Sequence, residues 1–265
     1  MTIAKKNSDL QKIEQEDTTK KLKLEEKIKL PIRNFLRDIN NDFYNEYITS
    51  GRVIDTSEYK TELAALLLGF YGIISPNFRD NIQQSFIEKL SPELKAKIAS
   101  EIKFENRIIS GKRSDLILNS TDREITSELA NTINELIENN EDITNLKVAE
   151  NTKKNLDNKV FGRAIIIAVS AVQTIAETAK QIEENVLYNN RVILDDVDLE
   201  ERMRDVWVAN FDERTRPAHL AASGQEKRPE DSFLVAGEYL RYPGDPNGSA
   251  GNIINCRCSK VVKII

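Results

Sequence analysis

The chain has 265 residues, of which 40% are hydrophobic, 31% charged and 6% aromatic. This composition is typical of a globular protein with an aliphatic core, and it excludes a fully disordered or fibrous chain. The net charge is -5, from 38 basic and 43 acidic residues, so a strongly basic surface for direct DNA binding has little support.

Two further features bear on the compartment and on membranes. No apolar run approaches the roughly 20 residues that span a bilayer, and the first residues, MTIAKKNSDLQK, lack the apolar core of a secretory signal. We therefore expect no transmembrane helix and no signal peptide. The two cysteines, Cys256 and Cys258, lie two positions apart, which argues against a disulfide framework and favours a reducing compartment.

The first part of the chain has the patterns of helices. Residues 1–30 are rich in Lys and Glu, and we expect a charged arm that is either a frayed helix or disordered. A helical region is expected over residues 31–190. Within it Ser75-Pro76 and Ser91-Pro92 each predict a helix start, and Thr121–Glu124 has capping-box spacing. After the first of these starts, apolar residues recur every four positions at Phe78, Ile82, Phe86 and Leu90.

The most regular pattern predicts one long helix with an apolar seam. Its apolar positions are spaced alternately four and three residues apart, at Phe161, Ile165, Ala168, Val172, Ile175, Ala179, Ile182 and Val186. Between Ala164 and Val169 the helix is apolar on all sides, which predicts burial inside a bundle. Such a seam either packs in the core or binds another chain, and both interpretations stay open.

The composition changes after Asn190. The last 65 residues contain 5 of the 10 Gly and 4 of the 7 Pro, and short apolar runs alternate with turn-forming segments. This pattern predicts a small α+β domain of short strands and loops over residues 201–265. The expected fold class is therefore mainly α, with a long heptad-patterned helix followed by that small domain.

The residues that could support chemistry lie in this last quarter. His219 is the only histidine, and it could bind a tetrahedral zinc ion together with Cys256 and Cys258. The fourth ligand would be a water or one of three carboxylates, Asp212, Asp231 or Asp245. A metal would stabilise a small domain with a thin core. Because C-x-C is shorter than the usual C-x(2–4)-C of structural zinc sites, two buried thiols beside a hydrogen-bonded histidine are the alternative.

Other chemistries have less support. A zinc deaminase needs H-x-E and P-C-x-x-C, whereas His219 is followed by Leu220 and Ala221. A thiolate beside His219 and Arg257 could act as a nucleophile, but no segment marks an oxyanion hole or a substrate pocket. P-loop and Gly-rich dinucleotide fingerprints are absent from the sequence.

Four blocks of the last quarter together resemble a known family. They are Trp207, Asp212-Glu213-Arg214-Thr215-Arg216-Pro217-Ala218-His219, Tyr242-Pro243-Gly244-Asp245-Pro246 and Asn255-Cys256-Arg257-Cys258. In order and spacing they resemble the C-terminal domain of phage Mu F-like minor head proteins and phage head morphogenesis proteins, over about residues 206–262. Family members often have an Arg-Thr-Glu element on the preceding helix, where this chain has Val169-Ser170-Ala171.

The resemblance implies a minor head (capsid) structural protein of a tailed bacteriophage or prophage. Such a protein would associate with the portal protein, contribute to head morphogenesis and to DNA retention or delivery, and lie in the virion head near the portal vertex after assembly in the host bacterial cytoplasm. The major capsid or scaffolding protein is a second expected partner. DNA contact has no support from charge, and no membrane partner is expected.

The resemblance also implies roles for residues. The family positions Trp207, Asp212, Arg214, Arg216, Pro243, Gly244, Asp245, Asn255 and Arg257 would be structural, and no enzymatic activity is expected. The alternative is a small metal-dependent or thiol enzyme module that is delivered with phage DNA.

Overall fold

The computed structural model describes residues 7–79, 90–190, 193–194 and 197–265. It is 71% helical, with long helices first and a small C-terminal region of short antiparallel strands and loops, which confirms the expected fold class. The helices are α1 (Asn7–Ser50), the 3-10 helix η1 (Thr56–Tyr59), α2 (Lys60–Arg79), α4 (Pro92–Glu138), α5 (Asn145–Asn189), α6 (Leu199–Arg202), α7 (Pro217–Ala222) and α8 (Ala250–Ile253). The strands are β1 (Ile193–Leu194), β2 (Val197–Asp198), β3 (Met203–Val208), β4 (Glu226–Lys227), β5 (Phe233–Val235), β6 (Glu238–Leu240) and β7 (Ser259–Ile264).

The starts of two long helices follow from local capping. At the start of α4 the Ser91 hydroxyl accepts a hydrogen bond from the backbone N–H of Leu94 at 3.2 Å, and Pro92 occupies the first helical position. Thr144 caps α5 in the same way, through the N–H of Lys147 at 3.3 Å. The helix start predicted at Ser91-Pro92 is therefore confirmed.

Two other predicted helix starts are wrong. Pro76 lies inside α2, which begins at Lys60, and the segment from Thr121 to Glu124 lies inside α4. The Thr121 hydroxyl donates to the carbonyl of Ile117 at 2.9 Å within the helix instead of capping a new one. Thr121 is 1% exposed, so packing around α4 outweighs the local signal. The predicted apolar positions 82 and 86 lie outside the described residues.

The long predicted helix forms as α5, but its buried face differs at the beginning. Phe161 is 59% exposed, and Val160 and Ala164 are buried in its place. Ile166 is 44% exposed, so α5 is not enclosed on all sides between Ala164 and Val169 as predicted. The enclosed stretch lies further on, over residues 168–188, where every residue except the half-buried Asn185 is buried. A helix with 3.6 residues per turn drifts away from a strict seven-residue seam, which accounts for the shift.

The chain forms two compact units. The first comprises Met1–Glu25, Gly69–Ile108 and Val169–Ile265, and the second comprises Glu26–Leu68 and Ile109–Ala168. Each of α1, α2, α4 and α5 thus has residues in both units, whereas the expected boundaries at residues 30, 190 and 201 followed changes of composition. Residues 7–30, expected as a charged arm, belong to α1.

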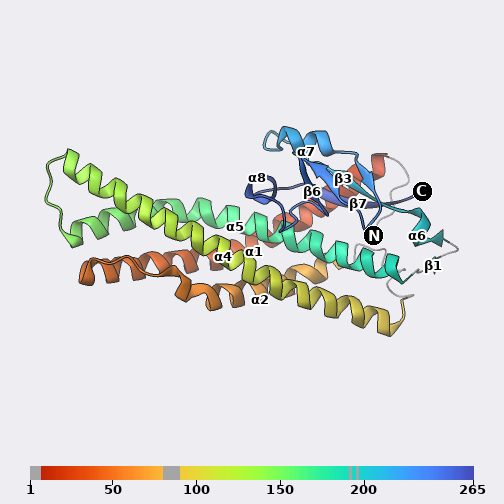
Figure 1. Cartoon of the computed structure of the whole chain (residues 1–265), viewed down its shortest axis with the longest axis horizontal. Coiled ribbons are helices and arrows are strands. Elements are labelled where there is room, and N and C mark those ends of the chain that lie inside the picture. The colour runs from red at the N-terminus through yellow and green to blue at the C-terminus, as the bar shows by residue number, and fades with distance from the viewer. Residues whose placement is uncertain (1–6, 80–89, 191–192, 195–196) are drawn as a thin grey trace. The chain divides into compact units, whose positions relative to one another are not determined.

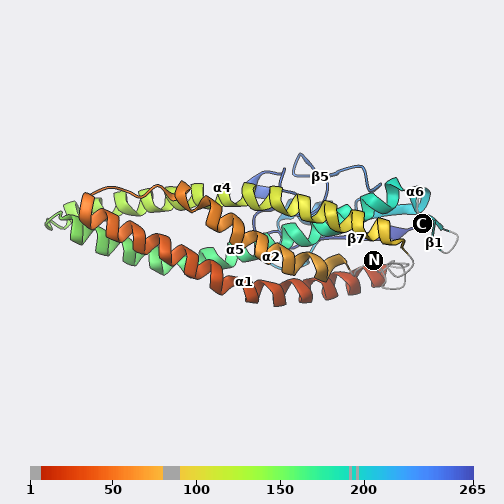
Figure 2. The same cartoon turned by 90° about the horizontal axis from the view of Figure 1, so that it is seen from below.

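The second unit is built from helical segments that run side by side (Figure 2). Side-chain hydrogen bonds join these segments. The Asn40 amide donates to Asp157 at 2.9 Å, and the Thr56 hydroxyl donates to Asp122 at 2.5 Å. These bonds connect α1 to α5 and η1 to α4.

The first unit contains the strands, which lie beside α5 (Figure 1). β3 is the central strand of an antiparallel sheet with the order β4-β3-β7, and its register with β7 runs from Met203↔Ile264 to Val208↔Ser259. β5 and β6 form a hairpin whose turn residues, Ala236 and Gly237, both have positive φ, as a type I′ turn requires. Trp207 and Phe233 pack in the core between these strands.

α5 is long and apolar enough to cross a membrane, by length and composition alone. Of the most apolar stretch of 18 residues in this helix, 67% is buried inside the protein. The core helix of a soluble protein meets the same criterion, so this helix is weak evidence for a membrane span.

Candidate metal centre

The structure brings together the three predicted metal-ligating residues of the C-terminal region. The Nδ1 atom of His219 lies 3.4 Å from the Sγ atom of Cys258 and 3.6 Å from that of Cys256. All three side chains are buried, and their ligand atoms lie within 4.8 Å of one another. This His219–Cys256–Cys258 cluster could hold a metal ion.

Local structure positions each member of the cluster. His219 lies on α7, which begins with Pro217 at its first position. The two cysteines flank Arg257 just before β7, and the preceding Asn255 has a φ of 57°, in the left-handed region that asparagine tolerates. This turn directs both thiols toward α7.

The ring of Trp207 packs against the ring of His219. Its ring lies 5.7 Å from the His219 ring and 5.4 Å from the Phe233 ring, in edge-to-face arrangements. The Nε2 atom of His219 has no hydrogen-bond partner among the described residues, so packing and the two thiols determine the orientation of the ring.

The pKa values of the two thiols are shifted in opposite directions. A hydrogen bond from Cys258, together with the neighbouring His219, lowers the pKa of Cys256 to about 5 against the effect of burial. The same hydrogen bond and burial raise the pKa of Cys258. The pair therefore has a thiolate at Cys256 near neutral pH, and a thiolate is the form of cysteine that binds metals.

The three carboxylates predicted as a possible fourth ligand differ in their position relative to the cluster. Asp212 lines the small cavity at the cluster, but its Oδ1 atom accepts a hydrogen bond from the N–H of Arg214, and its Oδ2 atom lies 3.8 Å from the guanidinium of Arg257. Asp245 instead holds a turn through Arg241, and Asp231 is exposed elsewhere. Of the three, only Asp212 is near the cluster.

Polar residues of α5 hold the loops around the cluster, and none of them is among the predicted site residues. The Gln173 amide donates to the carbonyls of Pro243 at 3.2 Å and Cys258 at 2.7 Å. The Ser170 hydroxyl accepts from the N–H of Asn255 at 2.9 Å. Thus α5 connects two of the sequence blocks around the cluster. The available signal was a run of Ser, Gln and Thr between the apolar positions of the helix.

Gly244 allows the loop to approach α5 closely. It has a φ of 79°, and its carbonyl accepts from the Thr174 hydroxyl at 3.0 Å. A Cβ atom at this position would lie 3.0 Å from Cγ of Gln173. Glycine is therefore required both by the backbone conformation and by the distance to the helix.

Next to the cluster, a buried ion network joins α1, α5 and the sheet. Its members are Asp17, Lys21, Glu177, Lys180, Glu184, Asp205, Lys227 and Lys260, none of which is more than 8% exposed. On the α1 side, the Lys21 ammonium lies 2.7 Å from Glu177 and 3.0 Å from Asp17.

On the sheet side of the buried ion network, Lys227 lies 2.7 Å from Asp205, and Lys260 forms ion pairs with both Glu184 and Asp205. The backbone N–H of Lys260 also donates to Glu177 at 2.9 Å, which connects β7 directly to α5. Removing one member would leave a buried charge without compensation, which costs several kcal/mol as an order of magnitude.

Comparison with known proteins returned no match: no family model, no curated protein and no solved structure matches this chain. The fold and the site therefore define a mainly α protein whose C-terminal strands and loops enclose a His–Cys cluster that could hold a metal ion.

Proposed function

We propose that this chain is a non-enzymatic minor head protein of a tailed bacteriophage or prophage, and that it binds the portal protein. The proposal begins with the four sequence blocks that resemble Mu F-like proteins. Trp207 and His219 are in ring contact, His219 contacts both cysteines, and the 242–246 block joins the cysteine block through Gln173. Blocks distant in sequence thus contribute to one structural unit, as expected of a shared structural core.

The observation that most supports a structural role is that the cluster is closed. The cavity beside His219, Cys256 and Cys258 has a free volume of about 10 Å³, whereas sites for small molecules measure several hundred Å³. Structural metal sites are closed by protein ligands, and catalytic ones keep an open position for substrate. A cavity of this size suits an ion better than a substrate, and this supports the proposed structural role.

Zinc is the ion that we propose for the cluster. Two thiolates and an imidazole are typical zinc ligands. Ligand atoms bound tetrahedrally to zinc at the usual bond lengths lie about 3.6 Å apart, and the nitrogen–sulfur distances are 3.4 Å and 3.6 Å. The ion would cross-link α7 to the segment before β7, with Asp212 or a water as the fourth ligand.

One observation favours the alternative of a thiol enzyme. The pKa of Cys256 is lowered to about 5, as in reactive cysteines. However, Cys256 is 1% exposed, so a substrate would reach it only after the cluster opened. The same lowered pKa equally suits metal binding.

Portal binding is tested by co-expression with the cognate portal protein, followed by size-exclusion chromatography. We expect the wild-type chain to elute with the portal ring. Elution of the chain alone, with both proteins folded, would contradict the proposed partner. A Cys256→Ser variant that still elutes with the ring but loses a turnover reaction of the wild type would support the enzyme alternative.

Metal content tests the zinc site directly. We expect about one zinc per wild-type chain after purification without added metal, and well below half of that for Cys256→Ser. Loss of an ion bound several hundred-fold above its dissociation constant lowers the free energy of unfolding by about 3 kcal/mol. Val206→Thr, an isosteric change at a buried position of β3, is the control for a general loss of stability and should retain the metal. A wild-type metal content near zero would refute the zinc site.

A further inference from the structure

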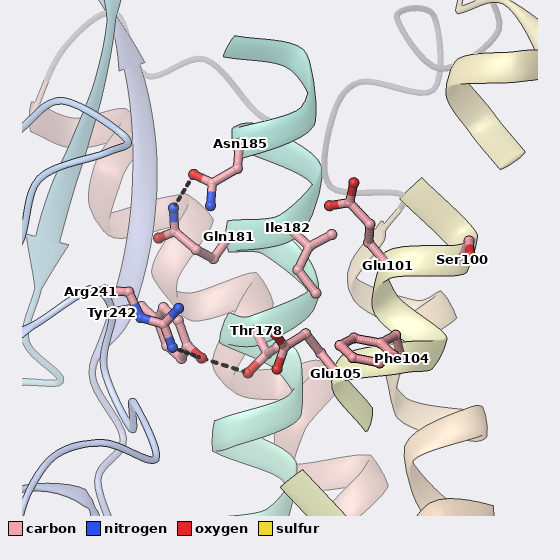
Figure 3. A pocket seen from close by; sticks show the side chains of 10 residues that line it. All are labelled: Ser100, Glu101, Phe104, Glu105, Thr178, Gln181, Ile182, Asn185, Arg241 and Tyr242. Carbon is pink, nitrogen blue, oxygen red and sulfur yellow. Dashed lines mark hydrogen bonds between the residues drawn. The ribbon is translucent and has the colours of Figure 1, made fainter. Parts of the chain in front are cut away.

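A cleft in the first unit lies apart from the His–Cys cluster. Its volume is about 460 Å³, within the range of sites that bind small molecules or side chains. Residues 100–105 of α4 line one side of the cleft, residues 178–185 of α5 line the middle, and Arg241 and Tyr242 lie on the side opposite α4 (Figure 3).

The cleft has two carboxylates that form no ion pair among the described residues, although Glu105 acts through space on Arg241 and contributes to the raised pKa of that guanidinium. Glu101 and Glu105 lie one helical turn apart on the α4 side, so their carboxylates are neighbours on the same face. Among the described residues neither has a hydrogen-bond or ion-pair partner. The positive charge of Arg241 is already paired, because its Nε and Nη2 atoms lie 3.0 Å and 3.3 Å from the two oxygens of Asp245.

An aromatic ring lies beside these carboxylates. Phe104 is 64% exposed although it is fully apolar, and it lines the cleft next to Glu105 (Figure 3). Ile182 forms an apolar part of the middle of the cleft. The face of an aromatic ring attracts a cation and stacks well on a planar guanidinium. The α4 side therefore offers negative charge and a π face to the same ligand group.

The α5 side of the cleft offers a hydrogen-bond donor. The Oδ1 atom of Asn185 accepts from the Gln181 amide at 2.7 Å, and this bond fixes the orientation of the Asn185 amide. Gln181 is itself anchored to the carbonyl of Pro229 and to Lys260. Within the described residues the Nδ2 atom of Asn185 has no acceptor, so it is free to donate to a carbonyl of a ligand.

We propose that this cleft binds an arginine residue of a partner protein. The guanidinium would pair with Glu101 and Glu105 and stack on Phe104, and a backbone carbonyl of the same segment would accept from Asn185. A free polyamine has the same cationic nitrogens but no carbonyl, and for this reason the Asn185 donor favours a peptide. The proposal goes beyond portal binding and does not depend on it.

Fluorescence anisotropy with the full-length chain tests the charge recognition. The probes are fluorescein-labelled Gly-Gly-Arg-Gly-Gly and the same peptide with Gln in place of Arg, at about 50 mM salt. We expect the Arg peptide to bind at least about tenfold more tightly, and Glu101→Gln/Glu105→Gln to remove this preference. The control Glu135→Gln/Glu138→Gln removes the same number of charges at exposed positions of the same helix, and it should keep the preference for the Arg peptide. Equal binding of both peptides, or an unchanged preference in a folded Glu101→Gln/Glu105→Gln variant, would overturn the proposal.

A second arm separates a peptide from a polyamine. Asn185→Ala should weaken binding of the Arg peptide severalfold. The spermidine concentration that displaces the peptide still bound to this variant should be the same as for the wild type. If Asn185→Ala has no effect on the peptide while spermidine displaces it at lower concentration than an unlabelled Arg peptide does, the site binds free polyamines and the peptide proposal is wrong. Circular dichroism melting of each variant confirms that it is folded.

Discussion

Glu184 shows how a single buried residue can link stability to pH. It lies on α5 and shares the ammonium of Lys260 with Asp205 of β3, while Lys227 pairs with Asp205 from the neighbouring strand. Burial, and next the negative charge of Asp205, raise the pKa of Glu184 to about 8, although Lys260 and Lys227 act in the opposite direction. Near neutral pH the folded protein thus holds a proton at Glu184 that the unfolded chain releases.

This difference predicts a loss of stability toward alkaline pH. A group whose pKa is raised by folding stabilises fully below its unfolded pKa, near 4.5, and loses that contribution as the pH rises through about 8. We expect the free energy of unfolding in urea to fall by about 4 kcal/mol between pH 5 and pH 8.5. Glu184→Gln should flatten this dependence, whereas Glu230→Gln at an exposed position should not. A wild-type slope that Glu184→Gln leaves intact would contradict the assignment.

At the same scale, the three residues of the cluster could be predicted from the sequence, but the residues that surround them could not. His219, Cys256 and Cys258 stand out because each residue type is rare in this chain and ligates metals. Ser170 and Gln173 are common residue types, and their contacts with Asn255 and Cys258 arise only when α5 meets loops 70 or more positions away. Spacing along the chain contains no information about such contacts.

At the scale of elements, α5 organises the first unit through hydrogen bonds as much as through apolar packing. Over residues 168–188 it is enclosed by the protein, and its Gln and Thr side chains bind the carbonyls of the 242–244 loop. The Thr178 hydroxyl also donates to the phenol of Tyr242 at 3.0 Å. The loop is thus attached at successive turns of one helix, with Gly244 at a point of close approach.

Gly244→Ala should destabilise the protein more than an equivalent change elsewhere. A non-glycine residue with positive φ costs about 1 kcal/mol, and here the new Cβ would also meet Gln173 at 3.0 Å. Gly224→Ala is the matched control, because Gly224 has a φ of 88° and nothing within 4 Å of the added atom. We expect chemical denaturation to show an additional loss of about 1 kcal/mol or more for Gly244→Ala. Equal losses for the two variants would mean that the loop can move away from α5 freely.

Helices were predicted well where capping and packing agree. Ser91 begins α4 because its hydroxyl caps the helix and Pro92 suits the first turn. Thr121 has an equally good local pattern, yet its buried position inside α4 continues the helix. Phe161 illustrates the other limit: its spacing fits the seam, but the helix turns it toward solvent.

At the scale of the whole molecule, the two compact units should respond differently to loss of the proposed zinc ion. The cluster lies entirely within the first unit. We expect a chelator such as 1,10-phenanthroline to increase amide hydrogen exchange in α7 and in residues 254–258, with little change in residues 26–68 and 109–168. An equal increase in both units would show that the ion stabilises the fold globally, and no change at all would argue against a bound ion.

The buried ion network has a consequence for how this protein can evolve. In the sheet the ammoniums of Lys227 and Lys260 share the carboxylate of Asp205, Lys260 also contacts Glu184 of α5, and the Ser259 hydroxyl donates to Asp17 near the beginning of the chain at 2.8 Å. A gene fragment encoding residues 201–265 alone would express a sheet with two buried ammoniums and one carboxylate, without the hydrogen-bond partners that α5 and α1 supply. Recombination between genes could therefore transfer this module successfully only with α5 and the first helical turns of α1, so the inherited unit is discontinuous in the gene.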